Sequence, residues 1–116
     1  MNFLEQGAKF LLPDNLIYLD ILKIFYERTK ISNQDFQNKE DIYNFCKKLE
    51  KFKEMKKPNF DNYIQTLYKW GNLEKSCNLK NINKYEKFIN ENQLYRVTKN
   101  TIILLEALRK IENNEK

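Results

Sequence analysis

Apolar residues recur with a helical period along the first part of the chain. Nine of the eleven residues from 16 to 26 are apolar, which predicts a helix over residues 16–29 that packs on more than one side. Pro13 precedes this helix, and we expect Asp14 or Asn15 to cap its first turn. This segment is therefore expected to form the central helix of the fold.

Two further helices are predicted between residues 38 and 71. Asn38, followed three residues later by Asp41, is similar to a capping box, and the polar residues 30–39 separate this start from the first helix. Pro58 suits the first turn of a third helix, and Gly71 suits the left-handed position after its end. The apolar face of the second helix comprises Ile42, Phe45, Cys46, Leu49 and Phe52.

The rest of the chain predicts two short strands and two helices. Leu73, Cys77 and Leu79 fall on alternate positions together with Lys75, as in a strand. Residues 81–90 predict a short helix, residues 94–97 predict a second, antiparallel strand, and Thr98 is expected to cap the last helix. Together the elements predict a single domain over residues 1–116 of the α+β class, mainly α: a winged-helix (helix-turn-helix) domain with a short helix inserted in the β-wing.

A net charge of +5 allows an acidic partner such as DNA. Much of the excess lies between residues 47 and 57, where six lysines accompany Glu50 and Glu54. This lysine cluster comprises Lys47, Lys48, Lys51, Lys53, Lys56 and Lys57. It is a candidate contact for the DNA backbone, but it fits an acidic protein surface or a solvated, solubilising surface equally well.

The third predicted helix presents a polar face, as the recognition helix of such a domain would. Its candidate base-reading residues are Asn62, Gln65, Thr66 and Lys69, since Asn and Gln can bond adenine through two atoms. Asp61 counts against this interpretation because its charge would repel phosphate near the helix start. A solvated polar face is the simpler alternative.

The last predicted helix, which follows Thr98, is apolar on most of its circumference. Such a terminal helix either fills a core or pairs with another molecule. We expect part of it to be internal and the remainder to form a protein interface. The interface candidates are Ile103, Leu104, Ala107 and Leu108.

The composition gives no sign of catalysis. The chain has no histidine, no Cys-x-x-Cys pair and no glycine-rich phosphate loop, so we expect no catalytic residue, no metal site and no cofactor. Cys46 lies on an apolar helix face and is expected to be a core residue. The chain shows no signal peptide and no run of 18 apolar residues, so we expect a soluble cytoplasmic protein that does not enter membranes.

The order of several motifs resembles one known family. The motifs are KFLL at residues 9–12, NLIYLDILKIFY at 15–26, LYKWGNL at 67–73, INKYEKF at 82–88 and LYRVT at 94–98. In this order they resemble the N-terminal winged-helix domain of the JetA family, the kleisin subunits of the bacterial Wadjet plasmid-defence complexes. The resemblance covers nearly all of this chain and only the start of the longer kleisin chains, which implies an N-terminal fragment or a stand-alone relative.

The resemblance implies a non-catalytic role in a condensin-like SMC complex that eliminates plasmid DNA. The expected partners are a second copy, in a homodimer, together with the SMC ATPase and its accessory subunits. Non-specific DNA contact and association with the nucleoid are also implied. Two alternatives remain open from the residues alone: a stand-alone winged-helix DNA-binding transcriptional regulator, and a small phage- or plasmid-encoded inhibitor protein.

Overall fold

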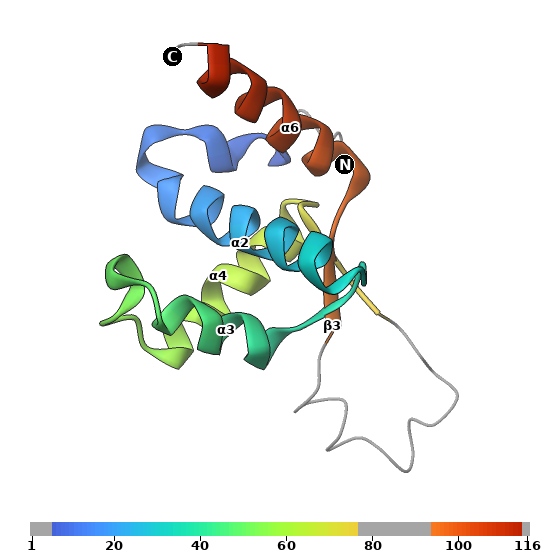
Figure 1. Ribbon diagram of the computed structural model, residues 1–116. Coiled ribbons are helices and arrows are strands. Elements are labelled where there is room, and N and C mark those ends of the chain that lie inside the picture. The colour runs from blue at the N-terminus through green and yellow to red at the C-terminus, as the bar shows by residue number, and fades with distance from the viewer. Residues whose placement is uncertain (1–5, 77–93, 115–116) are drawn as a thin grey trace.

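The computed structural model describes residues 6–76 and 94–114, which form a mainly helical α+β fold, as expected (Figure 1). The α-helices are α2 (Leu16–Ser32), α3 (Lys39–Lys47), α4 (Lys57–Lys69) and α6 (Lys99–Asn114). Short 3-10 helices are η1 (Lys9–Leu11), η2 (Pro13–Asn15) and η3 (Glu50–Phe52). The strands are β1 (Gln37–Asn38), β2 (Leu73–Lys75) and β3 (Leu94–Val97).

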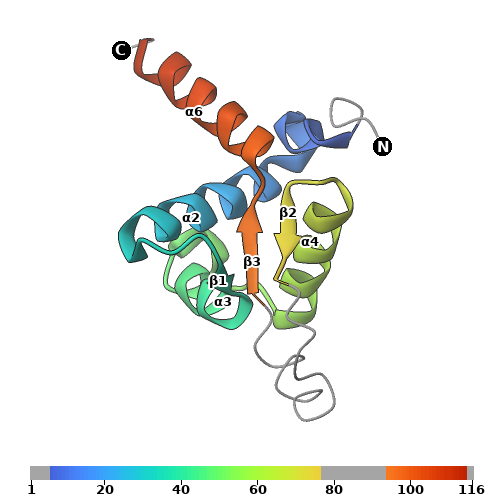
Figure 2. The ribbon, with the colours of Figure 1, turned by 90° about the vertical axis from the view of Figure 1, so that its right-hand side faces the viewer.

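The three strands form one antiparallel sheet in the order β1–β3–β2, with the last strand of the chain in the centre (Figure 2). Leu73 pairs with Val97, so the predicted antiparallel pairing of the two later strands is confirmed. Gln37 pairs with Tyr95, and this strand, β1, was not predicted. The predicted strand positions Cys77 and Leu79 and the predicted helix over residues 81–90 lie outside the described residues.

Helix α2 is the central element of the core, as predicted. Its buried side chains, Leu19, Ile21, Leu22, Ile24 and Phe25, cover much of its circumference. The helix continues three residues beyond the predicted end, and Asn33 terminates it in the left-handed conformation with φ of 58°. The predicted cap is wrong: no side chain caps α2, and the Asn15 side chain donates instead to the Lys9 carbonyl at 2.9 Å.

Helix α3 has the predicted start and an earlier end. The Asn38 side-chain oxygen accepts hydrogen bonds from the amides of Glu40 (2.8 Å) and Asp41 (3.3 Å), which confirms the cap. The prediction of a continuous helix to residue 52 is wrong, because the chain leaves the helix after Lys47 and is extended at Leu49. Helix η3 then brings Phe52 into the core, so the apolar spacing reflects burial without a continuous helix.

Helix α4 completes the helical framework and ends as predicted. Pro58 lies in its first turn, and Gly71 follows its end with φ of 83°, a conformation that costs glycine little. The Phe60 ring packs against Tyr43 of α3 with 5.2 Å between centroids. Cys46 is fully buried, as predicted, and its burial raises the pKa of the thiol to about 12. The core therefore lies between α2, α3, α4 and one face of the sheet.

Candidate interaction surfaces

Helix α6 begins at a polar junction that joins distant parts of the chain. The Thr98 amide donates to the Asn72 carbonyl at 3.0 Å, and the Thr98 hydroxyl donates to the Gly71 carbonyl at 2.7 Å. The buried Asn72 side chain donates to the Gly7 carbonyl (2.7 Å) and to the Thr101 hydroxyl (3.0 Å). Thr98 thus precedes α6 as predicted, but its hydroxyl is used to fix the helix to the turn between α4 and β2.

From this junction α6 runs across α2, on the side opposite α3 (Figures 1 and 2). One face of α6 is internal: Thr101 and Leu105 are buried, and Leu104 and Leu108 are half-buried against the core. Near the far end of α6, the Lys23 ammonium lies 3.3 Å from the Glu112 carboxylate. This exposed ion pair contributes little stability on its own, so the apolar inner face of α6 and the polar junction at its start hold the helix in place.

The adjacent face of α6 carries apolar side chains that the described residues do not cover. Ile103 and Ile111 are 55% and 56% exposed, and the exposed Ala107 lies between them at helical spacing. We call these three residues the α6 stripe. Of the predicted interface residues, Ile103 and Ala107 lie on the stripe, while Leu104 and Leu108 border it and also touch the core. Ile111 was left out of the predicted interface, although its spacing of four residues from Ala107 indicates it.

A cleft of about 450 Å³ opens where α6 leaves the sheet. Its apolar lining comes from three elements: Tyr26 of α2, Val97 of β3, and Ile102 and Ile103 of α6. Its charged lining comprises Asp35, Glu74, Arg96, Lys99 and Glu106. We call this the α6 cleft. This cleft could not be predicted from the sequence, because its residues come together only when α2, β2, β3 and α6 are assembled.

The structure divides the predicted lysine cluster into bonded and free side chains. The Lys47 ammonium donates to the carbonyls of Lys53 and Met55, the latter at 2.9 Å. Lys51 lies 3.2 Å from the Asp20 carboxylate, and Lys57 pairs with Glu40. The remaining three are exposed and have no side-chain partner among residues 6–76 and 94–114: Lys48, Lys53 and Lys56.

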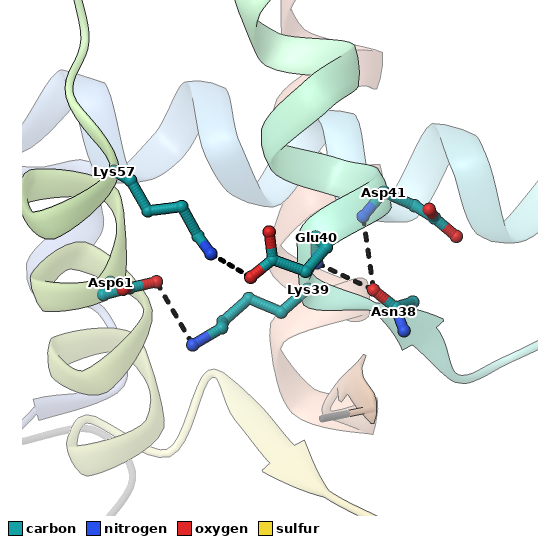
Figure 3. Close-up of polar contacts among 6 residues, drawn as sticks. All are labelled: Asn38, Lys39, Glu40, Asp41, Lys57 and Asp61. Carbon is teal, nitrogen blue, oxygen red and sulfur yellow. Dashed lines mark hydrogen bonds and ion pairs between the residues drawn. The ribbon is translucent and has the colours of Figure 1, made fainter. Parts of the chain in front are cut away.

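The starts of α3 and α4 are joined by two ion pairs (Figure 3). Lys39 lies 3.1 Å from the Asp61 carboxylate, and Lys57 is bonded to Glu40. The bond to Glu40 raises the pKa of Lys57, and the charge of Asp61 raises it further, while burial lowers it. Asp61, which was expected to repel phosphate, is therefore neutralised by Lys39, which the sequence did not indicate.

The candidate base-reading residues of α4 are not equally accessible. Asn62, Gln65 and Lys69 are exposed, whereas Thr66 is only half-exposed. Tyr68, which was not among the candidates, is 42% exposed on the same helix, and the Lys75 ammonium lies 4.9 Å from the centre of its ring. The polar face of α4 therefore exists, with an aromatic side chain at its edge.

Residues 6–76 and 94–114 contain neither a candidate metal site nor a candidate membrane-spanning helix. No group of three or more acidic, cysteine or histidine side chains there could hold a metal ion. In the same part of the chain, none of the helices combines the length and the apolar character that a membrane crossing needs.

Comparison with known proteins identifies a family. Neither a curated protein nor a solved structure matches the chain. A family model does match, over residues 11–116, and its description is Protein of unknown function (DUF2397). This match spans every described helix and strand from α2 to α6 and therefore both α6 surfaces. The chain belongs to the DUF2397 family.

Proposed function

We propose that this chain is the winged-helix domain of a JetA-type kleisin and acts as a non-catalytic protein-interaction module. In this role it binds a second copy of itself and takes part in the assembly of a condensin-like complex, with an SMC ATPase and accessory subunits, that defends the cell against plasmid DNA. The observation that carries the proposal is the α6 stripe, in which two large apolar side chains, Ile103 and Ile111, flank Ala107 on the exposed face of a helix in a highly charged chain.

The arrangement of the elements supports the winged-helix part of the proposal. A helix, a short strand, two helices and two further strands follow one another from α2 to β3. The first strand pairs with the last, which lies between the other two. This is the element order of winged-helix domains, in which α4 would correspond to the recognition helix.

The geometry of the α6 stripe supports self-association. Ile103 and Ile111 are equally spaced on either side of Ala107, so an antiparallel pair of α6 helices related by a two-fold axis at Ala107 would bring Ile103 of one copy toward Ile111 of the other. The small Ala107 side chain allows close approach of the helices at the axis. Two isoleucines from each copy become buried, each contributing at most about 1.5–3 kcal/mol, and the loss of free motion on association offsets part of this gain. We therefore expect a weak dimer with a dissociation constant of roughly 1–1000 μM.

Sedimentation velocity of the purified chain over a range of concentrations tests this proposal. We expect a concentration-dependent monomer–dimer equilibrium, and we expect Ile111→Gln to weaken it roughly tenfold or more because the buried isoleucine is lost in both copies. Arg109→Gln is the matched control, since Arg109 is an exposed residue on the other side of α6. Equal dissociation constants for the two variants, or a parent chain that stays monomeric throughout, would contradict the proposal.

DNA binding is the second candidate, favoured by the exposed and unpaired lysines of the cluster. Lys48, Lys53 and Lys56 lie free in the described part of the chain, beside an α4 whose Asn62 and Gln65 are exposed. In the proposed kleisin role this surface makes only weak, sequence-blind contacts with phosphates.

Fluorescence anisotropy with several duplexes at low and physiological salt separates the two functions. For a kleisin domain we expect weak binding that falls steeply with salt and weakens further in Lys48→Gln/Lys53→Gln/Lys56→Gln, because three phosphate contacts are lost. The control variant Lys30→Gln/Lys99→Gln/Lys110→Gln removes the same charge elsewhere and should bind like the parent. Sequence-dependent binding tighter than about 10⁻⁷ M at physiological salt would instead identify a DNA-binding regulator.

A further inference from the structure

The α6 cleft has the size and composition of a binding site. Its volume of about 450 Å³ falls within the range of roughly 300–1000 Å³ that is usual for ligand sites. Tyr26, Ile102 and Ile103 offer apolar contact surface, and the Thr29 side chain lies at the same wall. Ile103 belongs both to the cleft and to the α6 stripe. The other lining residues named here take no part in the proposed dimer contact between two α6 helices.

The α6 cleft has a net negative charge, whereas the chain as a whole has a net positive charge. Three carboxylates and two cations line it, whereas the whole chain carries a net charge of +5. Arg96 is already occupied, because its guanidinium lies 3.2 Å from the Glu74 carboxylate and 5.0 Å from the centre of the Phe36 ring. The remaining carboxylates, Asp35 and Glu106, have no cation within ion-pair distance among the described residues.

We infer that the α6 cleft binds a segment of another protein in which a lysine or arginine lies beside a large apolar residue. The apolar side chain packs on Tyr26 and Ile102, and this contact supplies most of the affinity. The cation pairs with Asp35 or Glu106, and this contact supplies the preference, since the cleft keeps more carboxylates than cations even with Lys99 counted and would repel an acidic segment. The α6 cleft is distinct from the dimer contact at Ile111, and binding in the cleft does not depend on self-association.

Two blocked tripeptides, Leu-Lys-Leu and Leu-Glu-Leu, are suitable probes for the isotope-labelled full chain in NMR titrations. We expect the lysine peptide to shift the amide signals of Thr29, Val97 and Ile102. The glutamate peptide should need at least roughly fivefold more peptide for the same shifts, since exposed ion pairs contribute modestly. Shifts confined to other parts of the surface, or none at all below about 10 mM peptide, would overturn the inference.

Carboxylate-to-amide variants distinguish recognition of the peptide charge from non-specific apolar binding. Asp35→Asn/Glu106→Gln should reduce the preference for the lysine peptide at least severalfold, while the apolar contacts remain. Asp14→Asn/Glu27→Gln makes the same chemical changes at two exposed carboxylates outside the cleft and should keep the preference. Thermal unfolding of both variants checks that the fold is retained. If both variants discriminate between the peptides as the parent does, the assignment of Asp35 and Glu106 fails, whatever the outcome for Ile111→Gln.

Discussion

Replacement of Phe60 by alanine is expected to lower the free energy of unfolding by about 3–5 kcal/mol, a large part of the stability of a small domain. Phe60 is fully buried on α4, and its ring packs against Tyr43 of α3, so truncation leaves a cavity between two helices. The ion pairs that join the starts of α3 and α4 are partly open to solvent and contribute little, so they do not compensate for the lost packing.

Urea denaturation followed by circular dichroism measures this effect. Tyr68→Ala is the matched control, since it removes an aromatic side chain that is 42% exposed on the same helix. We expect this control to cost about 1 kcal/mol or less, as is usual for surface substitutions. Similar losses in both variants would mean that α4 does not pack on α3 through Phe60.

The chain is also expected to lose stability in alkaline solution, beginning near pH 9. Burial raises the pKa of Cys46 from 9.0 to about 12. Burial, with the charges of Asp61 and Tyr68, raises the pKa of Tyr95 from 10.0 to about 12. The unfolded chain therefore releases these protons at lower pH than the folded chain, so their contribution is complete below pH 9 and is lost as the pH rises to about 12. The pKa of Lys57 is raised too, with the same sign.

Urea unfolding at a series of pH values tests this prediction. For Cys46 alone we expect a loss on the order of a few kcal/mol between pH 9 and pH 12. Cys46→Ala removes the first ionising group, so its stability should begin to fall only near pH 10, where Tyr95 of the unfolded chain ionises. A parent chain whose free energy of unfolding is the same at pH 8 and pH 11 would show that neither group is buried.

The parts of the fold that the sequence predicted are those determined by local pattern. α2, α4 and β3 were found because apolar spacing, Pro58 and Gly71 act within a few residues of one another. β1 was missed because Gln37 and Asn38 are polar and have no alternating pattern, and only pairing with β3 makes them a strand. The predicted end of α3 was wrong because Phe52 is buried by η3 at a position that also fits the spacing of a continuous helix.

The candidate surfaces, too, could be predicted only where a local sequence pattern determines them. The exposure of Ile103 and Ala107 could be predicted because an excess of apolar residues on one helix is visible in the sequence. The half-burial of Leu104 and Leu108 could not, since it depends on where α6 crosses α2. Two further contacts form only in the folded chain: Lys47 donates to backbone carbonyls, and Lys39 pairs with Asp61. These contacts distinguish lysines that look equivalent in the sequence.

The order of strands in the sheet has a consequence for the route by which the chain folds. β1 and β2 each pair with β3 and not with one another, so among the described strands neither has a partner until residues 94–97 are in place. Contacts between positions as distant as 37 and 95 form slowly, because loop closure costs entropy before the contact stabilises anything. Helices α2 to α4 can assemble first through nearby contacts. We therefore expect the sheet and α6, which follows β3 directly after Thr98, to form later than the contacts among these helices.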